Sequence, residues 1–146
     1  MRASFLFALI LTAAGTPAAA EKLPNKGTPS PRDMLAQIGS GVSDEELARA
    51  VKAASAYPLG SVKNPVRVGG PEGESAYVAR LRCAEGSKPE IGQRAPAGIG
   101  AYGTIVDRFP LDCKAAAPGK AEIVMDMYHE EHVETNAPPG LTLASE

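Results

Sequence analysis

The sequence predicts an α+β domain in which one helix packs on an antiparallel meander of about four strands. Three observations predict this fold class. A capped helical segment begins at Ser43, its periodicity ends near Pro58, and from Ser61 onward short strand-like runs alternate with turn signals. A small all-β barrel with a peripheral helix is the alternative fold.

The expected helix has recognisable start and stop signals. Ser43 and Glu46 have the spacing of a capping box, in which each side chain accepts a hydrogen bond from the other residue's backbone N–H. Apolar residues then recur at helical spacing as far as Tyr57, and Pro58 and Gly60 end the helix. Because its apolar face is narrow, we expect this helix to pack on a sheet rather than in a bundle.

Strand-like runs follow the helix. In the first of them, Pro65 indicates an edge strand or a bulge. In the second, apolar and polar side chains alternate after a Gly-rich turn over residues 69–74. The four runs cover residues 62–68, 75–83, 101–113 and 121–129.

A loop from Ala84 to Gly100 separates the second and third runs. Residues 98–103 match the dinucleotide-binding pattern G-x-G-x-x-G, but that fingerprint requires a strand before it and a helix after it. This copy follows a loop and leads into a strand. We therefore interpret its glycines as residues that let the loop enter the sheet.

The first twenty residues predict export from the cytoplasm. Arg2 provides a positive start, residues 5–11 are apolar, and Ala18–Ala20 is a small-residue cleavage site. The apolar run is too short to span a bilayer as a helix. We therefore expect cleavage after Ala20 and a protein of the periplasm, with the extracellular space as the alternative and no stable membrane anchor.

The rest of the chain divides by composition into a flexible leader over residues 21–42, one domain over residues 43–134, and a flexible tail over residues 135–146. Removal of residues 1–20 takes away only one charged residue, so Lys plus Arg falls from 15 to 14 against 17 Asp plus Glu, a formal charge of −3. This balance argues against a nucleic-acid binder and against attachment to anionic lipid.

Cys83 and Cys113 are the only cysteines of the chain. In an exported protein, two cysteines at the ends of strand-like runs favour a disulfide. A reactive thiol or a metal thiolate is the alternative, but the pair lacks C-x-x-C spacing and an obvious activating cation. We expect a structural bridge.

Both histidines lie in the acidic segment 126–134, which is the best candidate for a metal site or a pH-responsive site. Its candidate ligands for a divalent ion are Asp126, His129, Glu130 and His132. The spacing H-E-E-H differs from the H-E-x-x-H of metalloprotease helices. On a strand, residues three apart face opposite sides, so both histidines reach one ion only if the chain bends at Glu130. A solvated acidic strand end is the alternative interpretation.

A second candidate is a binding face formed by Arg67, Arg80 and Arg82 on the outer side of the predicted sheet. Arginine can make bidentate contacts with carboxylate or phosphate, so this face would suit an anion or an acidic partner. The alternative is an ordinary charged sheet face, in which the arginines pair across strands with Asp107, Asp112 and Asp126.

The segments YPLGSVKNPVRVGGPEGESAYVARLRC and EIVMDMYHEEHVE, within residues 57–134, resemble small uncharacterised exported proteins of proteobacteria. The resemblance covers about half of the chain. It implies the periplasm of a Gram-negative cell, and it implies no activity, because that group brings none.

The sequence predicts a non-catalytic binding module whose partner is a periplasmic protein or a small ligand. It contains no G-x-S-x-G nucleophile motif, and a hydrolase therefore ranks below this prediction. No cofactor is expected. The alternative function is a divalent-metal-binding or pH-responsive protein that uses His129 and His132.

Overall fold

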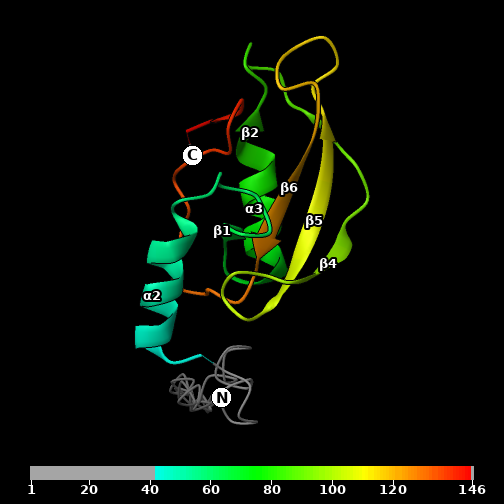
Figure 1. The fold of residues 1–146 in the computed structure, drawn as a ribbon. Coiled ribbons are helices and arrows are strands. Elements are labelled where there is room, and N and C mark those ends of the chain that lie inside the picture. Colours follow the sequence, from blue (N-terminus) through cyan, green and yellow to red (C-terminus); the bar gives the residue numbers. More distant parts are fainter. Residues whose placement is uncertain (1–41, 146) are drawn as a thin grey trace, which may run out of the picture.

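A five-stranded mixed sheet with helix α3 (Gly70–Arg80) on one of its faces is the centre of the fold (Figure 1). This computed structural model describes residues 42–145. Tyr77 and Leu81 pack from the helical side against Val66, Phe109 and other apolar side chains of the sheet. The fold class is therefore α+β, as the sequence predicts, but the described residues contain two helices, and the all-β alternative is not what forms.

The strand order of the large sheet is β1-β6-β5-β3, and β4 also pairs with β5. Strand β1 runs parallel to β6, whereas the other pairs are antiparallel. A separate pair, β2 and β7, is antiparallel. The strands are β1 Val66–Arg67, β2 Leu81–Arg82, β3 Glu90–Ile91, β4 Ala95–Ile99, β5 Ile105–Asp112, β6 Lys120–Asp126 and β7 Thr142–Leu143. The sheet is thus mixed rather than the antiparallel meander expected.

Helix α2 (Asp44–Ala54) begins as the sequence predicts. Ser43 and Glu46 form the capping box, in which the Ser43 backbone N–H donates to Glu46 Oε2 over 2.9 Å and the Glu46 N–H donates to Ser43 Oγ over 3.3 Å. However, Ala54 is the only fully buried residue of α2. The helix lies at the side of the molecule and does not cover the sheet (Figure 1).

The covering helix is α3, and there the sequence-based prediction was wrong. We expected a turn over residues 69–74 and a strand over residues 75–83, but residues 70–80 are helical. The segment also fits helical spacing, since its buried residues Glu74, Tyr77 and Leu81 recur at intervals of three and four. Pro71, in the first turn after the N-cap Gly69, is a signal for the start of a helix. Proline is also common in turns, so the same residue was consistent with the expected turn.

The other strands form with different bounds. The first expected run contracts to β1, and the third begins four residues later than expected, at Ile105. The expected loop over residues 84–100 contains β3 and β4. The G-x-G-x-x-G copy over residues 98–103 begins in the last two residues of β4, not after a loop as expected, and leads through the β4–β5 connection into a strand, not a helix. A Cβ at Gly100 would clash with Cγ1 of Val106, which explains a glycine there.

The C-terminal segment is not the flexible tail that we expected. Thr142–Leu143 form β7, which pairs with β2, and Leu141 belongs to the hydrophobic core. The apolar side chains of Leu141 and Leu143 stabilise this packing because they leave water when the segment docks. The expected signal peptide and almost all of the expected leader lie outside the described residues.

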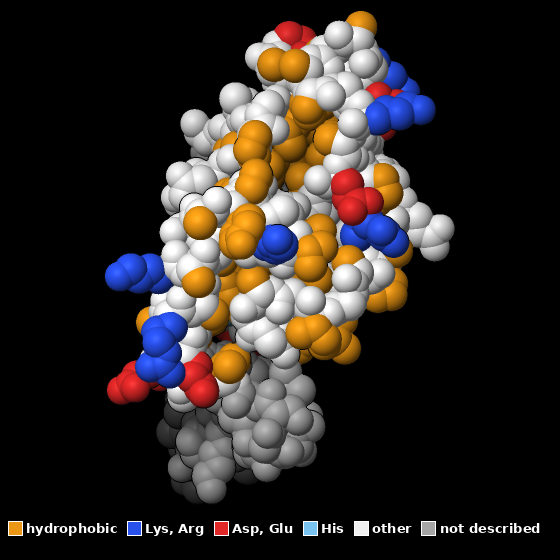
Figure 2. Space-filling view, in the orientation of Figure 1, with side chains coloured by type: hydrophobic (Ala, Val, Ile, Leu, Met, Phe, Trp, Pro, Cys, Tyr) orange, Lys and Arg blue, Asp and Glu red, His pale blue; other side chains and the backbone are white. Residues whose placement is uncertain are grey.

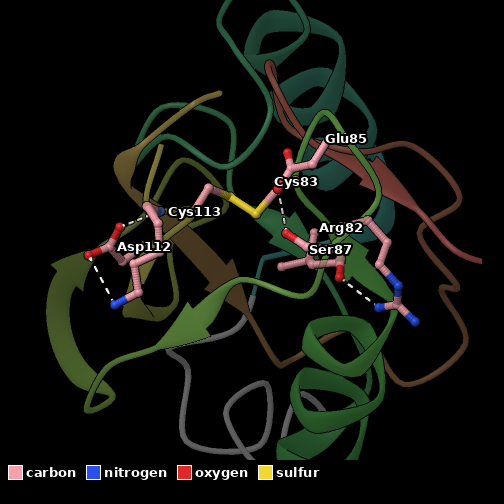
Figure 3. Close-up of a disulfide and its surroundings, with 8 residues drawn as sticks. Arg82, Cys83, Glu85, Ser87, Asp112 and Cys113 are labelled. Atoms are coloured by element: carbon pink, nitrogen blue, oxygen red, sulfur yellow. Dashed lines mark hydrogen bonds and ion pairs between the residues drawn. A yellow bond between two sulfur atoms is a disulfide. The ribbon is translucent and has the colours of Figure 1, made fainter. Parts of the chain in front are cut away.

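The expected disulfide between Cys83 and Cys113 is confirmed (Figure 3). The Cα atoms are 5.7 Å apart, and both side chains are buried in the core cluster. The bond joins the residue after β2 to the residue after β5, so it links the small sheet to the large one. Among residues 42–145, neither helix has the length and apolar character needed to cross a lipid bilayer.

Candidate functional site

A group of buried polar side chains interrupts the core between α3 and the sheet. Most of its members have less than a tenth of their surface exposed, and Arg94 covers them from outside. We call this group the buried acidic cluster, and it consists of Glu74, Arg94, Thr104, Asp107, Asp126 and His129. Burial of charged groups is costly unless they are paired, so such a cluster in a small core marks a candidate functional site.

Arg94 joins two of the carboxyl groups. Its Nη1 lies 3.3 Å from Oε2 of Glu74, and its Nη2 donates a hydrogen bond of 2.5 Å to Oδ2 of Asp107. The Arg94 side chain is 39% exposed, whereas that of Glu74 is 2% exposed. One partly hydrated guanidinium group therefore faces two carboxyl groups that are shielded from water.

Glu74 is the least well satisfied member of the cluster. Within the described part of the chain, neither of its carboxyl oxygens accepts a hydrogen bond, although Arg94 lies close by. Burial raises the pKa of Glu74 to about 7, because Arg94 offsets only part of the desolvation and the charges of Asp107 and Asp126 raise the pKa further. Glu74 is therefore a carboxyl group that changes protonation near neutral pH.

Asp126, at the end of β6, has no exposed surface. The hydroxyl of Thr104 donates to its Oδ2, and the backbone N–H of Tyr128 donates to its Oδ1 over 3.1 Å. Nε2 of His129 lies 3.5 Å from Asp126 Oδ2 and has no hydrogen-bond partner among residues 42–145. The rings of His129 and Tyr102 pack in a T-shaped arrangement, with 5.3 Å between ring centroids. Within residues 42–145, the cluster therefore contains two buried groups with polar atoms that make no hydrogen bond, Glu74 and His129.

The four predicted metal ligands do not come together. Asp126 and His129 are neighbours in the buried acidic cluster, whereas His132 faces Glu134 and Glu130 is exposed at the surface. Across residues 42–145, no group of three or more His, Cys, Asp or Glu side chains is placed to hold a metal ion. His129 and His132 are three residues apart and lie in different sites, as expected because the chain does not continue as a helix.

A cleft of about 250 Å³ lies between α3 and the segment that follows β6. We call it the α3 cleft. Its walls are largely apolar and include Val68, Ala76, Tyr77 and Val133. Its polar lining includes Arg80, His132 and Glu134. Apolar walls with a few polar groups are typical of small-molecule sites, and this volume lies slightly below their usual range.

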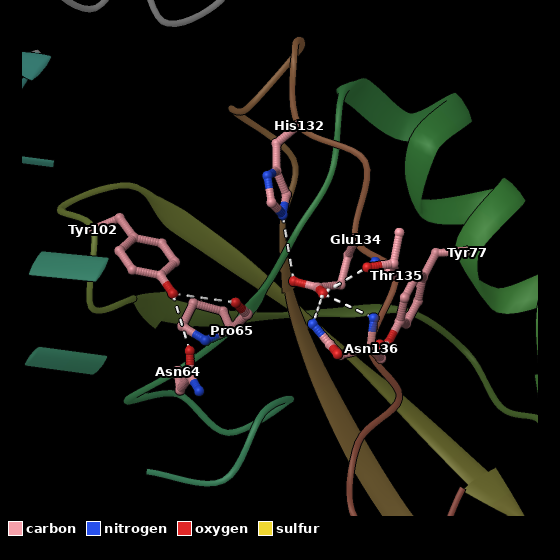
Figure 4. Close-up of polar contacts among 8 residues, drawn as sticks. All are labelled: Asn64, Pro65, Tyr77, Tyr102, His132, Glu134, Thr135 and Asn136. Carbon is pink, nitrogen blue, oxygen red and sulfur yellow. Dashed lines mark hydrogen bonds and ion pairs between the residues drawn. The ribbon is translucent and has the colours of Figure 1, made fainter. Parts of the chain in front are cut away.

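Glu134 organises one side of the α3 cleft (Figure 4). Its Oε1 accepts hydrogen bonds from the backbone N–H groups of Thr135 and Asn136, over 3.0 and 2.9 Å, and from Nδ2 of Asn136 over 2.9 Å. Its Oε2 lies 3.3 Å from Nε2 of His132. Burial alone would raise the pKa of Glu134, but hydrogen bonds from Asn136 and His132 outweigh it and lower the pKa. The carboxylate fixes the turn and the orientation of the His132 ring.

The predicted arginine face does not form. Arg67 lies in β1, Arg80 ends α3, and Arg82 lies in the small sheet. Arg82 donates to the backbone carbonyl oxygens of its own turn, and the Arg67 guanidinium lies 5.9 Å from the ring centroid of Tyr102. On the face drawn in Figure 2, Lys and Arg side chains are scattered among hydrophobic ones. The prediction of a shared arginine face was wrong because it required residues 75–83 to be a strand.

Sequence reasoning missed Glu74, Arg94 and Thr104, and it considered Asp107 only as a surface partner of arginine. Glu74 was assigned to a turn, so the sequence did not predict that its side chain lies on the buried face of a helix. Had residues 70–80 been recognised as helical, the spacing of Glu74 and Tyr77 would have predicted a buried carboxyl group. Arg94 has no comparable signal, since it precedes β4 in an irregular segment.

Comparison with known proteins finds no relative: no family model, curated protein or solved structure matches this chain. The function must therefore be argued from the chemistry of the site.

Proposed function

We propose that this protein is an exported, non-catalytic binding module that takes a small ligand in the α3 cleft. The observation that carries the proposal is the cleft itself, with apolar walls and a few polar groups on its lining. The confirmed disulfide supports export, because such bonds persist in oxidising compartments such as the periplasm. A cleft of about 250 Å³ suits a small organic molecule.

The lining of the cleft favours a ligand with an apolar body and a hydrogen-bond acceptor such as a carboxylate. Ala76, Tyr77 and Val133 offer apolar surface to the body. His132 and Arg80 are the lining groups that donate hydrogen bonds, and Arg80 brings a positive charge. The oxygens of Glu134 already accept bonds from the protein, which makes this carboxylate a positioning group rather than a ligand contact.

The non-catalytic part of the proposal rests on how the polar groups of the cleft are used. The Tyr77 hydroxyl donates to the carbonyl oxygen of Asn136 over 2.7 Å, and the Glu134 carboxylate fixes the same turn. Both groups serve the protein's own structure, so neither is free to act on a substrate. No grouping of ligands within residues 42–145 favours the metal-binding alternative.

Filling the cleft tests the proposal. Ala76 lines the cleft on α3, and Ala76→Leu would occupy it at little cost in helix propensity. The probe is a panel of small monocarboxylates with aliphatic and aromatic bodies, titrated into isotope-labelled protein and followed by amide NMR shifts. We expect saturable shifts in residues 69–80 and 130–134, lost in Ala76→Leu.

Ala79→Leu is the matched control, because Ala79 is exposed on the same helix and does not line the α3 cleft. We expect this variant to bind the panel as the wild type does. Equal binding by Ala76→Leu and wild type would overturn the proposal, as would a panel that causes no saturable shifts at the cleft. In the second case, shifts caused instead by an added periplasmic protein fraction would indicate a protein partner.

A further inference from the structure

We propose that the contact of Glu74 with Asp107 and Arg94 is a pH-dependent switch, which holds α3 against the sheet while Glu74 is protonated and releases the helix when Glu74 ionises. The switch would regulate the α3 cleft, and that part of the inference rests on the proposed function. The docking of α3 itself is independent of any ligand.

The docking of α3 depends heavily on Glu74. Glu74 and Tyr77 are the two fully buried residues of the helix. Tyr77 packs in the hydrophobic core and donates its hydroxyl hydrogen bond to Asn136. One of the two residues that anchor this helix is therefore apolar and fixed, and the other can gain or lose a charge.

Three elements present charged groups to Glu74. Arg94 comes from the segment before β4, Asp107 from β5 and Asp126 from β6. His129 lies beyond Asp126, 3.5 Å from its Oδ2. A single guanidinium group thus faces Glu74 and Asp107 together, with a third carboxyl group behind them. Full ionisation would leave more negative than positive charge in a buried space.

Protonation resolves this imbalance. A neutral Glu74 carboxyl can donate its proton in a hydrogen bond to Asp107, while Arg94 remains bonded to Asp107. Within the described residues, an ionised Glu74 accepts no hydrogen bond on either oxygen, and the guanidinium group 3.3 Å away is shared with Asp107. Its side chain also has only 1% of its surface exposed. A buried carboxylate without donors is strongly unfavourable, and the simplest relief is movement of α3 that admits water.

Release of α3 would open one wall of the cleft. The helix contributes Gly73, Ala76, Tyr77 and Arg80 to the α3 cleft. Arg80 also brings the positive charge of the cleft lining. A ligand that needs these residues would therefore bind tightly on the acid side of neutrality and dissociate on the alkaline side.

Amide hydrogen exchange in ligand-free protein tests the switch. Protection factors of α3 amides, which remove the intrinsic pH dependence of exchange, would be compared across about pH 5 to pH 9 for wild type and Glu74→Gln. In wild type we expect protection to fall by up to about tenfold per pH unit between about pH 5 and pH 7 and to level off above that, because the open helix loses the Glu74 proton at its ordinary pKa and the docked helix at about 7. In Glu74→Gln we expect α3 protection to be independent of pH.

Glu72→Gln is the matched control, because Glu72 is exposed in the same helix. We expect it to follow wild type. The switch would be overturned if α3 protection in wild type did not depend on pH, or if protection in Glu74→Gln declined with pH as it does in wild type. If Glu74→Gln fails to fold, ¹³C NMR of the wild-type Glu74 carboxyl decides. Titration near neutral pH together with α3 amide shifts supports the switch, and titration at the ordinary pH of glutamate refutes it.

The coupling to the cleft is measured separately, with the monocarboxylate panel at about pH 6 and pH 8.5. His132 also lines the cleft, so its contribution is removed by comparing wild type with Glu74→Gln at each pH. We expect affinity to weaken with rising pH more in wild type than in the variant. Equal pH dependence refutes the coupling. If no probe binds at either pH, the proposed function fails, while hydrogen exchange still decides the switch.

Discussion

At the scale of single residues, Asp126 depends on the donors that surround it. Its side chain is completely buried, and the Thr104 hydroxyl and the Tyr128 backbone N–H both donate to it. A hydrogen bond to a charged group contributes more than one between neutral groups. Removal of a single donor should therefore be costly even if the shape of the side chain is kept.

We predict that Thr104→Val destabilises the protein by about 2 kcal/mol. Valine keeps the shape of threonine but leaves Asp126 Oδ2 without its hydroxyl donor. Urea unfolding followed by circular dichroism measures the change. Thr135→Val is the control, because Thr135 is exposed and contributes only its backbone N–H to Glu134, and it should unfold within about 0.5 kcal/mol of wild type. Equal losses in the two variants would contradict the prediction.

Glu74 and Glu134 should act on stability in opposite pH ranges. The folded-state pKa of Glu74 is raised to about 7 by burial, so its contribution is full below the ordinary pKa and is lost as the pH rises to about 7. Desolvation opposes ionisation of Glu134, but its hydrogen bonds prevail and lower its pKa, so its contribution is present above the ordinary pKa and lost as the pH falls.

We therefore predict that stability is greatest near the ordinary pKa of glutamate, and that it declines both towards neutral pH and towards lower pH. Urea midpoints across the pH range measure this curve. Glu74→Gln should flatten its alkaline side, and Glu134→Gln should flatten its acid side. A Glu74→Gln curve that still declines from pH 5 to pH 8 would show that another group controls the alkaline side.

At the scale of elements, local signals were predictable from the sequence and the helix-or-strand choice for residues 75–83 was not. The Ser43 capping box is a short-range hydrogen-bond pattern, and it forms where the sequence predicts it. Residues 75–83 fit both periodicities, and only packing against the sheet decides between them. Because of that misassignment, the sequence did not identify Glu74 as a buried residue. It also assigned Arg80 and Arg82 to a sheet face that does not form.

We predict that Ser43→Ala frays the first turn of α2 but changes global stability little. The capping hydrogen bonds contribute about 1 kcal/mol to the helix, yet Ala54 is the only fully buried residue of α2, so the helix is weakly coupled to the core. Hydrogen exchange of residues 46–50 should accelerate while the urea midpoint stays near that of wild type. Ser43→Asp, which can still cap, should restore protection. A large fall in the midpoint for Ser43→Ala would show that α2 supports the core.

At the scale of the whole molecule, long-range pairings are what the sequence could not reveal. The parallel pairing of β1 with β6 joins Val66 to Met125, and the docking of β7 on β2 joins Leu81 to Leu143. Neither leaves a local pattern, because the partner strands are short and far apart in the chain. The disulfide was predictable because a chain with two cysteines leaves only one pairing.

We predict that the double substitution Cys83→Ser and Cys113→Ser lowers stability by about 3 kcal/mol, since the bond restricts a loop with a sequence separation of 30 in the unfolded chain. Thermal unfolding should show a clear drop in midpoint, and wild type treated with a thiol reductant should match the variant. A variant as stable as oxidised wild type would show that the disulfide does not limit stability.

Proteolysis of the last described residues would also affect the α3 cleft, because these residues contact Arg80. Arg80 Nε donates to the carbonyl oxygen of Ala144 over 3.3 Å, and the Ala144 N–H donates to the carbonyl oxygen of Arg80 over 2.8 Å. Proteolytic removal of residues 141–145 would take both contacts from Arg80 and would take Leu141 from the core. Under the proposed export, the protein would meet proteases outside the cytoplasm, and a few cleavages in this segment would then disable the proposed binding site in the α3 cleft, which lies on another element.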